Sequence, residues 1–452
     1  MFPEDVVAEK ETLVRLYKEL LKKQKNDPRF SMSDPPTCLC SVYGTKEQLN
    51  EVVEEAKRAL KDDKNYPDAY VALARVYATQ GRFKEAEAEL KNAITINPDF
   101  SDANFCTGDI YYQLGRYEEA ETYIKMAIDR DPLFASAYII LGRIYYNREM
   151  LPESESAFKK AISLKPSYAD AHLGLGGVYV SRGKFPESVA EHKKALKINP
   201  KYADAHTGLG WLFYLMNEHK NAEKSFLKAA SLKPEELEIY TGLGWVYYKQ
   251  GRFEEAENEF LKVKTIKGND LDAYVGLGWT YYRMFLLGES QLDAAEKEFR
   301  SAIKLDPNYG DAHVGLGWVN YHQDNLEEAE KRFLKAVELN PDSAGVRIGL
   351  GWVYYKWVNY KKERLKDAER EFRQAIELNP SDADSYVGMG WVMFRQDKNK
   401  DAKKYFKKAR DLNSGLADAL IGLATVYEKE GRKSEASEMF KKARKISPKG
   451  AF

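Results

Sequence analysis

The sequence predicts an all-α protein that forms a solenoid of stacked helical repeats, preceded by a helical extension. Two observations predict this fold. The chain repeats itself about every 34 residues, eleven times in all. Within each repeat, apolar residues recur at helical spacing in two stretches that a short polar turn separates. A fixed period of this size is typical of solenoids, in which each unit packs only on its neighbours.

The eleven repeats cover residues 67–450. Nine have 34 residues, and the seventh and ninth have 39 because five residues are inserted between their two helices. Each residue of a repeat has a position number, counted from the first residue of that repeat. The five inserted residues are not counted. The expected bounds are 67–100, 101–134, 135–168, 169–202, 203–236, 237–270, 271–309, 310–343, 344–382, 383–416 and 417–450.

Residues 1–66 precede the full repeats. Helical spacing of apolar residues predicts one helix over 4–25 and another over 45–62, with an irregular, proline-containing segment between them. Ala59 and Leu60 are in register with the second helix of a repeat, so we expect 45–62 to cap the stack as a half-repeat. The expected division is an extension (1–66), repeats one to four (67–202), repeats five to ten (203–416) and repeat eleven (417–450).

Several positions within the repeat explain themselves physically. Position eight is glycine in nine repeats and position 20 is alanine or serine in all eleven, so the first helix (A) and the second helix (B) can approach closely. Gly251 illustrates the glycine that ends helix A, and the proline at position 32 in nine repeats ends helix B. Position 24 is usually a phenylalanine plug: Phe158, Phe226, Phe260, Phe299, Phe333, Phe372, Phe406 and Phe440.

This pattern resembles the tetratricopeptide repeat family, which has a large residue at position four, Leu-Gly at seven and eight, Tyr at eleven, Ala at 20 and 27, Phe or Tyr at 24 and Pro at 32. The resemblance covers 384 of 452 residues. It implies a right-handed superhelix in which A helices line an inner groove and B helices lie outside. Gly268 and Ser414 replace the proline, and His192 replaces the phenylalanine. The lysines and asparagines with which some members hold acidic C-terminal tails are absent here.

Positions 2, 9, 12 and 13 share one side of helix A, which faces the groove in this family. Position two is acidic in nine repeats. Position nine is tryptophan in repeats five to ten: Trp211, Trp245, Trp279, Trp318, Trp352 and Trp391. Position twelve places an aromatic ring beside it: Tyr214, Tyr248, Tyr282, Tyr321, Tyr355 and Phe394. Position thirteen is basic from repeat six: Lys249, Arg283, His322, Lys356, Arg395 and Lys429. These rows are our candidate partner-binding residues.

Two interpretations of the tryptophans stay open. Each comes with a glycine at position six, which costs about 1 kcal/mol against alanine in a helix interior. An indole lying on a neighbouring glycine would offset this cost, and the indoles would then be either half-exposed as a binding surface or buried as packing. The acidic residues also favour the helix dipole without any ligand.

Composition and motifs exclude several functional classes. The chain has 70 basic and 70 acidic residues; because Phe394–Phe452 holds 16 basic and 8 acidic, that segment carries +8 and the remainder −8. No apolar run is long enough to span a membrane. Three cysteines argue against a disulfide framework and favour the cytoplasm. No catalytic constellation, metal site or cofactor motif is found, and three histidines at position four (His172, His206, His313) are expected to pack between helices.

We therefore expect a non-enzymatic scaffold that binds an extended segment of a partner protein along the groove of repeats five to ten. The alternative is self-assembly into end-to-end oligomers or filaments through an open C-terminal stacking face and the N-terminal extension. Glycan or single-stranded nucleic-acid binding is a weaker alternative, because the acidic row and zero net charge count against nucleic acid. The insertions of repeats seven and nine should project from one rim, where Trp357 and Tyr360 form a contact point or simply lengthen helix A.

Overall fold

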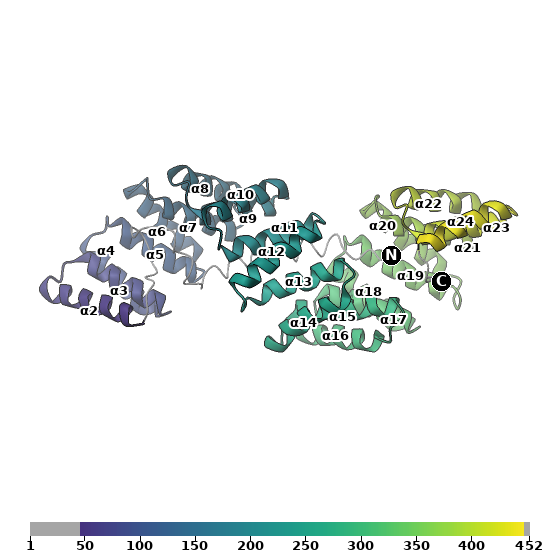
Figure 1. Ribbon diagram of the computed structural model, residues 1–452, viewed down its shortest axis with the longest axis horizontal. Helices are drawn as coiled ribbons and strands as arrows, with labels where there is room; N and C mark the ends of the chain where they lie inside the picture. Colours follow the sequence, from purple (N-terminus) through teal and green to yellow (C-terminus); the bar gives the residue numbers. More distant parts are fainter. Residues whose placement is uncertain (1–45, 447–452) are drawn as a thin grey trace. The chain divides into compact units, whose positions relative to one another are not determined.

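The computed structural model describes residues 46–446, and every regular element in this range is an α-helix. Consecutive helices pack as A–B pairs, as Figure 1 shows. The all-α solenoid is therefore confirmed. The helix expected over 4–25 lies outside the described residues. The chain divides into two compact units between Ile239 and Tyr240, inside α13 (Leu237–Lys249).

Helix bounds follow the repeat register closely. In the N-terminal unit the helices are α2 (Lys46–Asp62), α3 (Pro67–Thr79), α4 (Phe83–Ile96), α5 (Ser101–Gln113), α6 (Tyr117–Arg130), α7 (Ala135–Asn147), α8 (Leu151–Leu164), α9 (Ala169–Ser181), α10 (Phe185–Ile198), α11 (Ala203–Leu215) and α12 (His219–Leu232). In the C-terminal unit they are α14 (Phe253–Ile266), α15 (Leu271–Leu286), α16 (Leu292–Leu305), α17 (Gly310–His322), α18 (Leu326–Leu339), α19 (Ala344–Trp357), α20 (Arg364–Leu378), α21 (Ala383–Arg395), α22 (Asn399–Leu412), α23 (Ala417–Lys429) and α24 (Lys433–Ile446).

In the nine repeats of 34 residues, the turn between helices A and B has a left-handed residue at position fifteen. Gly251 has φ 75°, and the amide of Arg252 donates to the carbonyl of Tyr247 at 2.9 Å, which closes the end of helix A. Four repeats place a polar residue other than glycine in the same conformation: Glu149, Asn217, Asp324 and Asp397. The place of the residue in the repeat therefore predicts this turn better than its type does, although glycine is the commonest residue there.

The phenylalanine at position 24 holds neighbouring repeats together. Phe260 is fully buried between Gly244 of its own helix A and Gly276 of the next repeat's helix A. A Cβ added at Gly244 would lie 2.7 Å from the Phe260 ring, and one at Gly276 would lie 2.5 Å from it. The same glycine–phenylalanine–glycine arrangement surrounds Phe158, Phe299, Phe333, Phe372 and Phe406.

This arrangement corrects one expectation. The glycines at position six do not make room for an indole, as the sequence suggested. They make room for the phenylalanine of the preceding helix B, as Gly315 does for Phe299 and Gly388 does for Phe372. The cost of a mid-helix glycine, about 1 kcal/mol, is offset by the burial of a whole aromatic ring.

The N-terminal end of the stack is covered by α2. Ala56 is buried in a small cluster with Ala69 and Leu73 of α3, and Leu60 packs against that cluster. The helix expected over 45–62 is thus confirmed, and it covers the first helix A. Cys106 is buried in α5. The expected cytoplasmic location stays a prediction.

The two insertions lengthen helix A and add a short exposed segment. α15 has 16 residues and α19 has 14, against 13 in most A helices. Trp357, the last residue of α19, is buried, whereas Tyr360 in the segment that follows is 71% exposed. Their rings lie 6.0 Å apart and Lys361 lies over the indole. Trp357 therefore anchors the insertion, and Tyr360 faces outward.

His192 is the one polar residue in the plug position. It is fully buried between Gly176 and Gly208, and its Nδ1 donates to the carbonyl of Ser188 at 2.8 Å. Burial lowers the pKa of His192 to about 4. The imidazole is therefore neutral in the folded chain near neutral pH, and it fills the space that a phenylalanine fills elsewhere.

Replacing Gly276 with alanine should destabilise the protein by about 1–3 kcal/mol, because the added methyl group overlaps the Phe260 ring and neither helix can move freely. The matched control is Gly310→Ala, where nothing lies within 4 Å of the added Cβ. Chemical denaturation followed by circular dichroism compares the two. If helix propensity decided the outcome, both variants would be stabilised alike, and the packing explanation would be wrong.

The stability of the protein should fall with acidification between pH 6.5 and about 4, partly through His192. In this window the unfolded chain binds a proton that the buried imidazole does not, so protonation favours unfolding, by up to about 3 kcal/mol at pH 4. His192→Phe removes this contribution and keeps the plug. Melting temperatures of both proteins across the window measure the difference, since the other histidines are common to both. Parallel curves would contradict the assignment.

Candidate functional site

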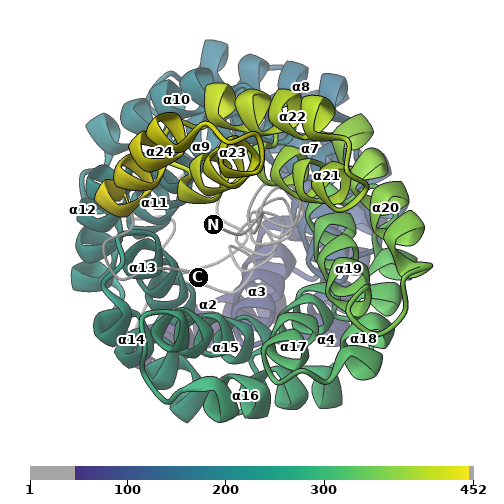
Figure 2. The same ribbon diagram turned by 90° about the vertical axis from the view of Figure 1, so that its right-hand side faces the viewer.

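The candidate site is the face that the A helices present on the concave side. In the C-terminal unit, α15, α17, α19 and α21 lie on the inner side and their B-helix partners α16, α18, α20 and α22 lie outside, as Figure 2 shows. An internal helix A contacts the A helices on either side of it, helix B of its own repeat and helix B of the repeat before it. The side chains at positions 9, 12 and 13 of helix A contact the phenylalanine plug or the neighbouring A helices.

Every tryptophan of position nine packs edge-on against the phenylalanine plug of its own repeat. The ring centroids lie 5.2–5.3 Å apart in all six pairs. The position-twelve ring of the same helix lies 5.6–5.9 Å away on another side of the indole. Such edge-to-face contacts are favoured by the aromatic quadrupole. The indoles thus extend the plug toward the concave face.

The exposure of these rings varies along the chain. Trp211, Trp279 and Trp318 are buried, at 3%, 8% and 2% exposure, and so are Tyr214, Tyr248 and Tyr282. The side chains that are half-buried are Trp245, Trp352, Trp391, Tyr321, Tyr355 and Phe394. The buried six offer a partner little contact area, whereas the half-buried six keep part of a ring accessible.

The acidic residues of position two accept hydrogen bonds within the stack. The Trp211 indole donates to Glu238 at 3.2 Å, and Arg75 lies 3.4 Å from Asp102. Each contact joins position nine of one repeat to position two of the next. Repeat two departs from the rule, because its position nine is the acidic Asp109 and the next position two is Ser136. The pairing of residues 27 apart was not predicted from the sequence.

Other position-two acids bond to tyrosine or lysine. The Tyr309 hydroxyl donates to Asp272 at 2.7 Å, and Lys233 forms an ion pair with Asp204 at 2.7 Å. Burial raises the pKa of Asp384 to about 7, with the charges of Asp382 and Asp418 acting in the same direction. The acidic row is therefore largely part of the scaffold.

The basic residues of position thirteen lie over the position-twelve ring of the preceding repeat. Lys356 Nζ is 4.5 Å from the centre of the Tyr321 ring, and Arg395 Cζ is 5.3 Å from that of Tyr355. His322 occupies the same place, with its ring 5.7 Å from that of Tyr282. Burial lowers the pKa of His322 to about 4.

These cations also have polar partners. Lys356 pairs with Asp324 at 2.5 Å, and Arg395 donates to Asn359 at 3.1 Å. Arg283 of repeat seven lies 5.9 Å from the Phe253 ring. From repeat eight on, the basic row thus covers the aromatic row of the preceding repeat. Cation–π contacts such as those of Lys356 and Arg395 contribute roughly 0.5–1 kcal/mol each at exposed sites.

The histidines at position four contact the backbone of the preceding turn. The Nε2 atoms of His172, His206 and His313 lie 3.2, 3.2 and 2.9 Å from the carbonyl oxygens of Pro166, Pro200 and Pro307. Tyrosine makes the same contact where it occupies position four, as Tyr386 does with Pro380 at 3.2 Å. These histidines pack between helices, as the sequence analysis expected. In residues 46–446 no cluster of three or more potential metal ligands occurs.

Family models named Tetratricopeptide repeat match residues 53–99, 71–133, 105–169, 207–270 and 358–416 with one model and 286–347 and 393–451 with another. A further model, TPR repeat, matches 176–217. The chain belongs to the tetratricopeptide repeat family. Members of this family typically act as protein-interaction scaffolds, and this chain has the fold of such a scaffold. A search of curated proteins finds no match to the sequence.

Solved structures show the same fold at low identity. The hetero-tetramer of Cut9 and Hcn1 from the APC/C is 15% identical, with a TM-score of 0.53 over 98% of this chain and 94% of that one. The human IFIT1 dimer with m7Gppp-AAAA is 16% identical, with a TM-score of 0.49 over 95% and 99%. No helix in the described part of the chain is long and apolar enough to cross a membrane.

Replacing both Trp279 and Trp318 with alanine should destabilise the protein strongly, by about 3–5 kcal/mol for each indole, because both are buried against the plugs Phe299 and Phe333. The shift of the denaturation midpoint measures this loss. Tyr360→Ala, at a ring that is 71% exposed, is the control and should leave the midpoint nearly unchanged. An unchanged midpoint in the tryptophan variant would mean that these indoles are not part of the core.

Proposed function

We propose that the protein is a non-enzymatic scaffold that binds an extended segment of a partner protein on its concave face. The observation that carries the proposal is a patch of accessible rings and cations on three consecutive A helices. Its members are Trp352 and Tyr355 of α19, Trp391, Phe394 and Arg395 of α21, and Lys429 of α23; we call it the concave patch. Trp245, Lys249, Arg283, Tyr321 and Lys356 extend the candidate surface toward repeat six.

The geometry of the concave patch suits an extended chain. Arg395 lies over Tyr355 and Lys429 lies over Phe394, 4.7 Å from its centre, so ring and cation alternate from repeat to repeat. Half-buried rings that the scaffold holds in place give contact area at low entropic cost. The cations along one side of the groove would fix the direction of the bound segment, while most position-two acids are held in contacts within the stack.

The buried rings of the predicted row have a supporting role in this proposal. Trp211, Trp279, Trp318, Tyr214, Tyr248 and Tyr282 position the neighbouring helices and present no area of their own. Binding specificity would then come from repeats nine to eleven, where the rings are accessible. We place no nucleic acid there, because Asp384 and Asp418 lie at position two on the same helices as the cations.

Reversing the charge of Arg395 and Lys429 to glutamate should weaken binding of a concave-face partner by at least about tenfold, because exposed cations steer and orient an incoming segment. Both side chains are exposed, so the fold should persist. The full chain, immobilised, is used to capture partners from an extract of the native source, which mass spectrometry then identifies.

The matched control is Lys407→Glu with Lys408→Glu, an equal change of charge at exposed sites of the outer helix α22 in repeat ten. Partners lost with the concave variant and kept with the α22 variant support the proposal. Partners kept by both variants would show that the concave patch is not the binding surface.

Self-assembly is the second candidate function, and one observation favours it. Phe440 is half-buried, whereas the seven other phenylalanine plugs are at most 1% exposed. A second copy could cover it by stacking on α24, which would give a heterologous contact. Light scattering distinguishes this candidate from the first, because a protein that is strictly monomeric at all concentrations does not assemble.

A further inference from the structure

Consecutive repeats are joined on their outer surface by a polar clasp. Position 21 of one helix B supplies a carboxylate, and position 11, 14 or 16 of the next repeat supplies its partner. The Tyr111 hydroxyl donates to Glu87 at 2.8 Å, and Arg116 lies over the Tyr111 ring. In the next interface, Tyr145 donates to Glu121 at 3.1 Å and Arg148 pairs with the same carboxylate.

The clasp recurs along both units with changed partners. The further pairs are Glu155–Arg182, Glu257–Tyr281 (2.8 Å), Glu296–Gln323 (2.8 Å), Glu330–Arg364 (3.1 Å), Glu369–Gln396 (2.8 Å) and, with reversed charge, Lys403–Glu430 (2.8 Å). The residue types vary, but a polar side chain always faces a polar side chain. This constancy makes an exception informative.

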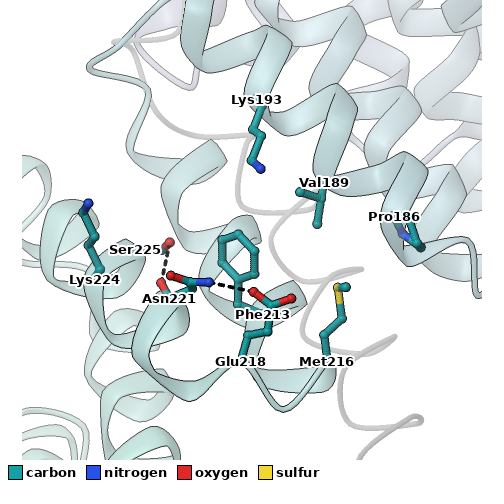
Figure 3. A pocket seen from close by; sticks show the side chains of 9 residues that line it. All are labelled: Pro186, Val189, Lys193, Phe213, Met216, Glu218, Asn221, Lys224 and Ser225. Carbon is teal, nitrogen blue, oxygen red and sulfur yellow. Dashed lines mark hydrogen bonds between the residues drawn. The ribbon is translucent and has the colours of Figure 1, made fainter.

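The interface between repeats four and five is the exception among those described within each unit. Position 21 is Val189, position 11 is Phe213 and position 14 is Met216, so the carboxylate, the tyrosine and the arginine are all replaced by apolar side chains. Together with Pro186 they line a cavity of about 500 Å³ on the outer surface. Figure 3 shows Val189 of α10 facing Phe213 of α11 and Met216, which follows α11, across this cavity, which we call the outer groove.

The rim of the outer groove is cationic. Lys193 and Lys224 are exposed, and Lys193 Nζ lies 5.9 Å from the centre of the Phe213 ring. In the described part of the chain neither lysine forms an ion pair. The one carboxylate of the rim, Glu218, accepts a hydrogen bond from the Asn221 side chain at 2.6 Å. The rim therefore leaves two ammonium groups available beside an apolar floor.

We propose that the outer groove is a second docking site, which takes a protein segment with a bulky apolar side chain flanked by carboxylates. The apolar side chain enters between Val189, Phe213 and Met216, and the carboxylates pair with Lys193 and Lys224. A cavity of this size suits one or two large side chains. The site is formed by helix B of repeat four (α10) and by the end of helix A, the turn and helix B of repeat five. It shares no residue with the concave patch, so two partners can bind together.

Synthetic peptides test this assignment on the full chain. Three fluorescein-labelled probes are compared: a central Leu-Phe pair flanked by glutamates, the same pair flanked by lysines, and a central Ala-Ala pair flanked by glutamates. The first should bind at least about tenfold more tightly than the other two, because only it satisfies both the floor and the rim. Fluorescence anisotropy gives the three dissociation constants.

Two variants locate the binding. Val189→Glu with Phe213→Tyr and Met216→Arg rebuilds the clasp of repeats two and three and should abolish binding while the melting temperature does not fall. Lys193→Ala with Lys224→Ala, at two exposed sites, should weaken the glutamate-flanked probe by about tenfold without affecting folding. The second variant decides the question if the first does not fold.

Several outcomes would overturn the assignment. Equal affinity for the three probes, or undiminished binding by the lysine variant, would show that the outer groove does not select this chemistry. A concentration-dependent dimer that the rebuilt clasp abolishes would assign the groove to a second copy of the chain instead. Charge reversal at Arg395 and Lys429 should leave binding of the probe unchanged, so failure here is distinct from failure of the concave proposal.

Discussion

In six repeats one phenylalanine ring held between two glycines joins the repeat to the next, and the rest of the structure depends on this contact. Because the ring fills the space between two A helices, neither helix can carry a β-carbon at that point. The indole of position nine then packs on the edge of the same ring, and the position-twelve ring packs on the indole. The aromatic rows of the concave face therefore continue the packing of the core.

The two faces of the solenoid follow one rule of pairing. On the concave side, a cation of one repeat covers a ring of the repeat before it, and on the outer side a carboxylate of one repeat meets a tyrosine, arginine or glutamine of the next. Both contacts connect neighbours, as a solenoid requires. We therefore expect functional surfaces where this pairing is incomplete. These places are the accessible rings in repeats nine to eleven and the apolar groove between repeats four and five.

Much of the fold could be predicted from the sequence, because period, glycine, alanine and proline positions all reflect local rules. Helix bounds, the cap formed by residues 45–62 and the role of position fifteen follow from those rules. The burial of individual tryptophans could not be predicted, since Trp279 and Trp352 occupy the same position and both follow Gly-Leu-Gly. The exposure of a ring on this face depends on the side chains that neighbouring repeats place around it, which the repeat pattern alone does not fix.

The partial burial of Phe440 has a consequence for where the protein begins to unfold locally. In a stack with nearest-neighbour coupling, each phenylalanine that bridges two repeats contributes to the cooperativity between them. In the last described helix pair the plug faces Ala424 of its own helix A in place of a glycine, and no following helix A is described beside it, so we expect its coupling to be the weakest along the C-terminal unit. Local unfolding should begin there and proceed inward one repeat at a time, like fraying at the end of a helix.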